Sequence, residues 1–244
     1  MFDTAKLKHE WAKKHIANLQ SAFNTFVQTS RHTIRASSDP DTDNVALQLS
    51  FDEPIPPAVP LMIGDIVHNF RSALDHATWE LIGLDGGTQN RRLSFPARGT
   101  KQDFNSACDG IETPRADTKS FFRGFEAYEQ GSGRIIFGLH CLSNVDKHRI
   151  LTPLLGATRI PGVKVINPDG MVIAEYADCS FTMGEGGRTH FSVGRGCRIE
   201  LDDETNPTIE AFFGDVEVFR ELPIFPMLAE FISIKIAEVI VRFE

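Results

Sequence analysis

The chain has little of several features that would narrow its function at once. Its 244 residues include only four cysteines, and no two of them form a C-x-x-C pair or a spacing typical of a zinc site or a disulfide framework. Tyr and Trp occur twice each against 19 Phe, so we expect the aromatic side chains to lie mainly in the core. No apolar run is long enough to cross a membrane, and no secretory signal is recognisable. We therefore expect a cytoplasmic protein without a membrane partner.

Positive charge is also scarce. The formal net charge is −8 and the isoelectric point is about 5.5. This balance argues against broad nonspecific binding to nucleic acid, which needs a basic surface, but it allows a small local basic site. The motifs G-x-S-x-G, G-x-x-x-x-G-K-[ST] and H-E-x-x-H are all missing. No common hydrolase or nucleotide-binding motif thus indicates a cofactor, and we expect none.

What the sequence does contain is a clear hydrophobic periodicity. Helical spacing of apolar residues predicts a first helix over about 4–36 and a second from about Pro60 to Leu84, after a proline-rich connector. Between them, the alternation of apolar and polar residues over 45–51 predicts a short strand. Shorter helices are predicted over 101–108, 114–128 and 134–145.

The pattern changes after Pro153. Short alternating runs between glycine-containing turns predict an antiparallel meander over 156–222, and a helix returns after Pro223. The sequence therefore predicts an α+β fold, in which residues 1–155 and 223–244 form a helical bundle with a β-rich insertion at 156–222. We expect the C-terminal helix to pack back on the bundle. The runs read as strands cover 163–166, 171–176, 179–183, 189–193, 198–201 and 208–213.

The most informative stretch is GDIVHNFRSALDH at residues 64–76, which places many polar side chains in an otherwise apolar helix. Such groups are costly to bury without a purpose. At helical spacing they form two neighbouring stripes opposite an apolar face, and Arg71 and Asp75 are spaced for an ion pair. The first stripe consists of Asp65, Asn69, Ser72 and His76, and the second of His68, Arg71 and Asp75.

A second segment, HCLSNVDKHR at residues 140–149, repeats this mixture near the end of a predicted helix. Two interpretations stay open for its basic residues. Cations at a helix C-terminus stabilise the helix dipole and cap carbonyls. Alternatively, Lys147 and His148 complete a phosphate site that faces Arg71 and His76.

The spacing Arg71-x4-His76 resembles the R-x4-6-H motif of the HEPN superfamily, with Ser72 as the polar residue after the arginine. Members of that superfamily are helical bundles and often metal-independent ribonucleases, whose site usually forms between two protomers. The resemblance implies RNA as a partner and a homodimer. It also implies His76 as general acid or base and Arg71 as the phosphate clamp, which are roles that imidazole and guanidinium groups can fill.

The remaining polar residues would support those two. Asp75 and Asn69 are the candidates for orienting the catalytic pair. The candidates for substrate binding are His68, Asn144, Lys147 and His148. Separately, the strings GDxxHNxRSALDH and DKHR resemble a recurrent signature of bacterial proteins of unassigned activity.

Two other functions fit the same residues. In a non-enzymatic interaction or assembly protein, the polar helix face would be a structural network between helices. In a metal- or small-molecule-binding bundle, Asp65, His68 and His148 would be the metal ligands. Two features oppose cation binding: Glu is absent from both segments, and Arg71 and Lys147 lie beside the candidate ligands.

Overall fold

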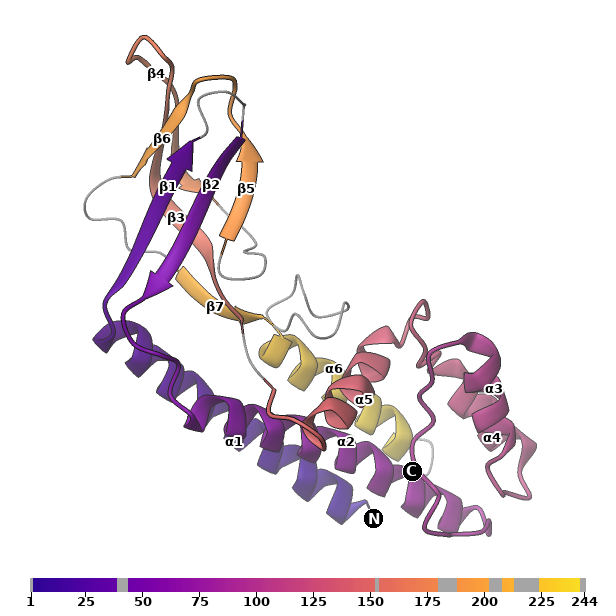
Figure 1. Cartoon of the computed structure of the whole chain (residues 1–244). Helices are drawn as coiled ribbons and strands as arrows, with labels where there is room; N and C mark the ends of the chain where they lie inside the picture. Colours follow the sequence, from indigo (N-terminus) through magenta and orange to yellow (C-terminus); the bar gives the residue numbers. More distant parts are fainter. Residues whose placement is uncertain are drawn as a thin grey trace. The chain divides into compact units, whose positions relative to one another are not determined.

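The computed structural model describes residues 2–38, 44–151, 154–179, 188–201, 208–212 and 224–241. The chain divides into two compact units, which Figure 1 shows in sequence colours. The first unit comprises residues 1–22, 57–152 and 215–244, and the second comprises 23–56 and 153–214. Helices with two antiparallel sheets confirm the predicted α+β class.

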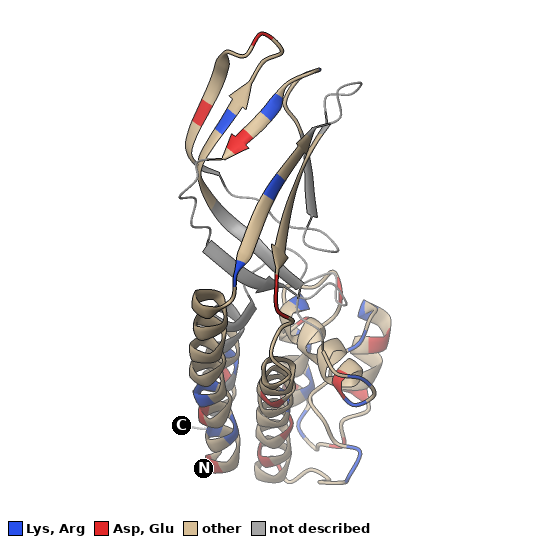
Figure 2. Ribbon diagram, turned by 60° about the vertical axis from the view of Figure 1, so that its left-hand side comes forward, with Lys and Arg blue, Asp and Glu red and all other residues tan. Residues whose placement is uncertain are grey.

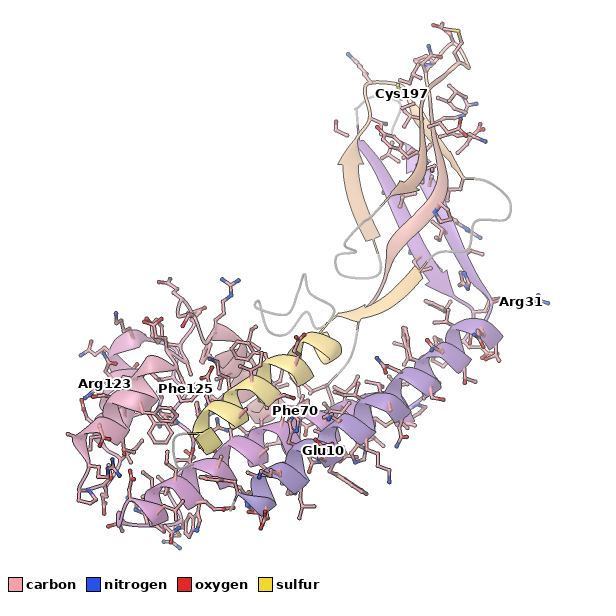
Figure 3. The ribbon with its side chains drawn as sticks, turned by 180° about the vertical axis from the view of Figure 1, so that it is seen from behind. Glu10, Arg31, Phe70, Arg123, Phe125 and Cys197 are labelled. Carbon is pink, nitrogen blue, oxygen red and sulfur yellow. The ribbon has the colours of Figure 1, made fainter. Side chains whose placement is uncertain are left out.

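The first unit is helical, and α2 is its central helix. Both α5 and α6 pack against α2, which confirms that the C-terminal helix returns to the bundle. Phe70 of α2 is fully buried and lies among these helices (Figure 3). The helices of this unit are the N-terminal part of α1 (Asp3–Thr29), α2 (Ala58–Leu84), α3 (Lys101–Asp109), α4 (Ala116–Gly124), α5 (Arg134–Asp146) and α6 (Ile224–Val241).

The N-terminal part of α1 joins this core through small and aromatic contacts. Ala5 and Ala12 are fully buried, whereas Leu7 and Trp11 are 68% and 50% exposed. His9 lies between the helices. Its Nε2 is 2.7 Å from the Ser233 hydroxyl of α6, and its ring packs on Phe70.

The second unit consists of two antiparallel sheets around one apolar core. The first sheet has the order β1-β2-β5, and in the second β3 pairs with β4, β6 and β7. Leu47, Val163 and Ile199 are among the side chains buried between them. The strands are β1 (His32–Ser38), β2 (Asn44–Phe51), β3 (Leu154–Ile166), β4 (Val172–Cys179), β5 (Arg188–Ser192), β6 (Arg198–Leu201) and β7 (Thr208–Phe212).

One predicted element is wrong. The helix expected to reach residue 36 ends at Thr29, and β1 follows it from His32 to Ser38. The reason is that residues 32–38 pair with β2 over residues 45–51. This pairing sets Ile34 opposite Leu49 and places Ile34 against the apolar core of the second unit. With β2, which matches the strand predicted over 45–51, β1 forms β-structure outside the predicted insertion at 156–222. Of the strand expected at 179–183, all but Cys179 lies outside the described residues.

No helix among the residues that the structure describes is both long enough and apolar enough to span a membrane.

Candidate functional site

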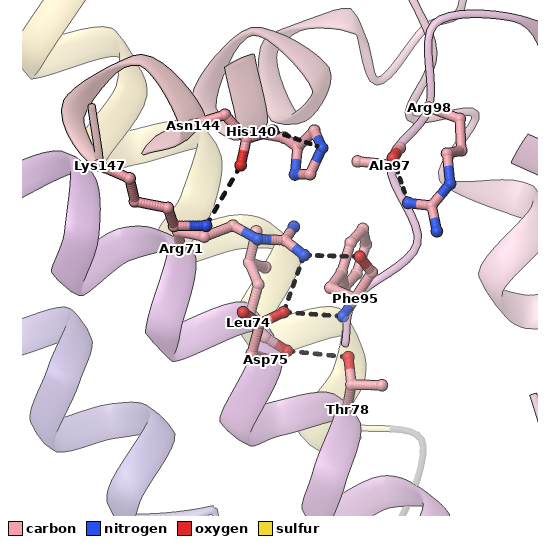
Figure 4. Close-up of polar contacts among 10 residues, drawn as sticks. All are labelled: Arg71, Leu74, Asp75, Thr78, Phe95, Ala97, Arg98, His140, Asn144 and Lys147. Atoms are coloured by element: carbon pink, nitrogen blue, oxygen red, sulfur yellow. Dashed lines mark hydrogen bonds and ion pairs between the residues drawn. The ribbon is translucent and has the colours of Figure 1, made fainter. Parts of the chain in front are cut away.

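Buried Arg71 and half-buried Asp75 form an ion pair on α2 that also holds the connection between α2 and α3. The Arg71 Nη2 atom lies 2.9 Å from Asp75 Oδ1 and donates to the Phe95 carbonyl oxygen at 2.8 Å. The Phe95 N–H donates in return to Asp75 Oδ1 at 2.8 Å. Figure 4 shows this closed set of contacts. Because the Phe95 ring is fully buried against Phe122 and Phe125, the ion pair anchors a packed segment to α2.

Because burial disfavours an isolated charge, the charged states of Arg71 and Asp75 stabilise each other. Burial raises the pKa of Asp75, while the Arg71 guanidinium and the Phe95 N–H lower it. Arg71 is only 7% exposed, and its Nη1 atom has no hydrogen-bond partner among the described residues. A buried charge that loses its partner is strongly destabilising. Arg71 is therefore held as part of the protein interior.

A second, more open group of polar side chains lies next to this pair. It comprises Arg98 of the α2–α3 connection, His140 and Asn144 of α5, and Lys147, which caps the C-terminus of α5, and we call it the α5 cluster. His140, Asn144 and Lys147 follow one another at helical spacing, which places them on one face of α5. Figure 4 shows the His140 ring between Lys147 and Arg98.

The hydrogen bonds of the α5 cluster fix the state of His140. Lys147 Nζ donates to Asn144 Oδ1 at 3.2 Å, so the Asn144 amide nitrogen is the group that faces His140 Nε2, at 3.0 Å. An amide nitrogen only donates, so Nε2 must accept and the ring proton lies on Nδ1. This assignment comes from the hydrogen-bond network. It makes His140 a neutral imidazole with one N–H left to donate.

The charges around His140 favour the same state. Its pKa is lowered from 6.5 to about 4, first by burial and then by the positive charges of Arg71, Arg98 and Lys147. At neutral pH the imidazole is therefore uncharged and is surrounded by cations.

The α5 cluster thus has the electrostatics of an anion site. Three cations act on His140, while the nearby carboxylate of Asp75 is already paired with Arg71. The only side-chain hydrogen bond of Arg98 among the described residues goes to the adjacent Ala97 carbonyl, at 2.8 Å, so most of its donors are free. Elsewhere on the helices, cationic and anionic residues are interspersed (Figure 2). The positive potential is therefore local.

The structure brings together four of the residues predicted for the site: Arg71, Asp75, Asn144 and Lys147. His76 forms no hydrogen bond or ion pair with them in the described part of the chain, although its charge acts weakly on Asp75. His76 lies five positions after Arg71 on α2, which turns the two side chains about 140° apart around the helix axis. His76 is exposed, whereas Arg71 is buried.

The other predicted residues have partners away from the α5 cluster. Asn69 is buried, donates to the Asp65 carbonyl at 2.7 Å and accepts from Lys8 Nζ at 3.2 Å. His68 lies 3.4 Å from the Ser72 hydroxyl. Asn69 therefore links α2 to α1.

The end of α5 is fixed by a close approach to α2. A Cβ atom on Gly64 would lie 2.5 Å from the Asp146 Oδ1 atom, so the glycine leaves room for this carboxylate. Burial raises the pKa of Asp146. Because Asp146 precedes Lys147, the contact holds the basic end of α5 against α2. His148, which follows, is exposed.

The metal alternative finds no support in this geometry. The described residues contain no group of three His, Cys, Asp or Glu side chains that could hold a metal ion. Asp65, His68 and His148 are all described, and they do not form such a group.

Sequence reasoning missed two members of the α5 cluster. His140 begins the second polar segment, and its spacing of four residues from Asn144 is the signal that could have found it. Arg98 lies in a connection without a motif, so only the fold reveals it.

Three comparisons with known proteins, against family models, curated proteins and solved structures, give no match. The resemblance of Arg71 and His76 to the HEPN motif therefore stays a prediction. What the site does has to be inferred from its own chemistry.

Proposed function

We propose that the helical unit is a HEPN-like, RNA-binding unit that holds a backbone phosphate at the α5 cluster. The observation that carries this proposal is the grouping of Arg71, Arg98 and Lys147 around the half-buried His140 (Figure 4), whose pKa their charges lower. A phosphodiester has one negative charge and two free oxygens. Guanidinium and ammonium groups bind such oxygens through charge-assisted hydrogen bonds.

The exposure of the α5 cluster favours a polymer backbone as the ligand. Arg98, Asn144 and Lys147 are all exposed, and they come from two separate segments of the chain. A strand can therefore reach them from solvent. With a net charge of −8, the chain favours binding at such a local site over binding across a broad surface.

We include metal-independent cleavage in the proposal because the resemblance to HEPN ribonucleases implies it. A neutral imidazole can take a proton from a ribose 2′-hydroxyl, and neighbouring cations can stabilise the charge that develops on the phosphate. His140 can take a proton in this way only when Asn144 releases its Nε2 atom, and a bound phosphate would raise its pKa toward the neutral range. His76 is the other candidate, as the exposed histidine of the motif.

Binding is tested by fluorescence anisotropy with a labelled single-stranded RNA. Arg98→Ala and Lys147→Ala should each weaken binding about fivefold or more. Each should also lower the slope of log affinity against log salt concentration by about 1, the loss expected for one phosphate contact. The matched control is Arg134→Ala, an exposed cation at the other end of α5. Equal affinity in all three variants, or no binding by the wild-type protein, would refute the proposal.

Cleavage is tested with the same RNA in EDTA, and each variant is first checked for RNA binding. Loss of cleavage in His140→Ala assigns the proton transfer to the α5 cluster. Loss in His76→Ala alone assigns it to the HEPN-like motif. Intact RNA with the wild-type protein would limit the function to binding. The homodimer that the resemblance implies is measured in parallel by sedimentation velocity.

A second function is favoured by the closed network of Arg71, Asp75 and Phe95. If the polar face of α2 is purely structural, the chain is a non-enzymatic interaction or assembly protein. In that case, variants of the α5 cluster change neither RNA binding nor cleavage, and Arg71→Ala changes only stability.

A further inference from the structure

A pocket of about 350 Å³ lies between the α2–α3 connection and the C-terminal end of α3. Its size is at the lower end of the range of small-molecule sites, about 300 to 1,000 Å³. All of its lining residues belong to the helical unit. The lining includes Thr88, Asn90, Arg92, Ser94, Arg98 and Ile111.

The walls combine two kinds of surface. Thr88, Asn90 and Ser94 bring hydroxyl and amide groups, whereas Leu93 and Ile111 bring apolar contacts. A nucleobase presents the same combination, with flat apolar faces and an edge of hydrogen-bonding groups. Proteins that read unpaired RNA use such mixed sites.

The pocket is also cationic. Arg92 is exposed, and its guanidinium has no partner among the described residues. Arg98 is the second arginine, and Glu112 is the single acidic residue of the lining. An arginine can stack on a base or hold a phosphate, so both kinds of contact are available.

Arg98 joins the pocket to the α5 cluster. It lines the pocket, and its charge also acts on His140 and on Arg71. A ligand with an anionic group at Arg98 would therefore meet the α5 cluster on one side and the pocket on the other.

We propose that this pocket holds the base and ribose of a nucleotide whose phosphate lies at the α5 cluster. This inference rests on the proposed RNA function and adds its substrate class: a nucleoside phosphate whose base is neither paired nor stacked. The pocket has room for one such base and no room for a duplex. The nucleotide is either part of an unpaired RNA strand or a free mononucleotide.

The test compares a short single-stranded RNA with an abasic ribose–phosphate strand of the same length. Both strands carry the same phosphates, and only one can fill the pocket. The wild-type protein should bind the RNA about tenfold more tightly than the abasic strand, as expected for one stacked base. Lys147→Ala should weaken both strands equally, because Lys147 belongs to the α5 cluster and does not line the pocket.

Two variants fill the pocket and one is a matched control. Ala107→Trp, in the lining on α3, should abolish the preference for the RNA and leave the affinity for the abasic strand unchanged. Thr88→Leu, at an exposed position that tolerates substitution, should reduce the preference about threefold even if Ala107→Trp does not fold. Gln102→Trp adds a tryptophan to an exposed position of α3 outside the pocket, and should change nothing.

The outcomes separate the two proposals. Equal wild-type affinity for both strands would overturn the pocket inference and leave RNA binding in place. Binding of neither strand would overturn the proposed function and the inference together. Competition by a mixture of nucleoside monophosphates then tells whether the natural ligand is an RNA strand or a free nucleotide. If it is a free nucleotide, the mixture should displace the RNA at a concentration near the Kd of the strand.

Discussion

Two arginines of the helical unit, Arg71 and Arg98, have the same chemistry and very different surroundings. Arg71 is buried and bonded to Asp75 and to the Phe95 carbonyl. Arg98 is exposed, and among the described residues its side chain bonds only to the carbonyl beside it. Both add positive charge around His140. Burial and partners therefore decide which arginine can take a ligand, although only Arg71 lies in a motif.

The largest expected effect comes from removing the buried arginine. Arg71→Ala leaves the Asp75 carboxylate and the Phe95 carbonyl without their partner, so we expect a loss of about 3 kcal/mol in the free energy of unfolding. Urea denaturation followed by the fluorescence of Trp11 and Trp79 measures it. Arg98→Ala is the matched control and should stay within about 0.5 kcal/mol of wild type. Similar losses in both variants would remove the distinction between the two arginines.

The next effect concerns pH. The pKa of His140 is about 4 in the folded protein and ordinarily 6.5, so on acidification the unfolded chain takes up this proton first. The contribution of His140 to stability is complete above about pH 6.5 and is lost as the pH falls to about 4. His140→Gln should therefore flatten the fall in melting temperature between these values. The difference between the two proteins isolates His140 from Asp75, whose raised pKa acts in the opposite direction. An unchanged slope would contradict the neutral state of His140.

Much of the helical unit could be predicted because its signal is local. The apolar residues of α2, such as Ile63, Phe70 and Leu74, recur at helical spacing, and the predicted range of 60–84 differs by only two residues from Ala58–Leu84. β1 could not be found in this way. Its segment continues the amphipathic pattern of the preceding helix. It becomes a strand only through hydrogen bonds to β2, which form once the chain has turned back on itself.

The candidate site likewise contains one part that local spacing predicts and one part that it does not. Arg71 and Asp75 are four residues apart on one helix, so their ion pair could be predicted from spacing alone. Arg98 approaches His140 only because the Phe95 segment folds back onto α2. Their proximity depends on the tertiary packing of three separate segments, and no periodicity encodes it.

A smaller effect should follow from changing one donor of the α5 cluster. Asn144→Asp replaces the amide that donates to His140 with a carboxylate that accepts, and it adds a negative charge 3.0 Å from the ring. An imidazolium can donate to that carboxylate, so the pKa of His140 should rise by about 1 or more. NMR titration of the His140 ring measures the change. The same variant should weaken RNA binding, because it neutralises part of the positive charge. An unchanged pKa would contradict the assigned hydrogen bond.

The smallest effect tests whether the open cations act on His140 as separate charges. Lys147 is the weakest of the three cations that lower the pKa of His140, so Lys147→Met should raise it by only about 0.3. Arg98→Met should raise it further, since Arg98 contributes more than Lys147. Both changes should shrink in high salt, because exposed charges are screened. Arg134→Met, a cation of α5 outside the α5 cluster, should leave the titration unchanged. If all three variants titrate alike, burial alone keeps His140 neutral, and the charge that would attract a phosphate is not concentrated there.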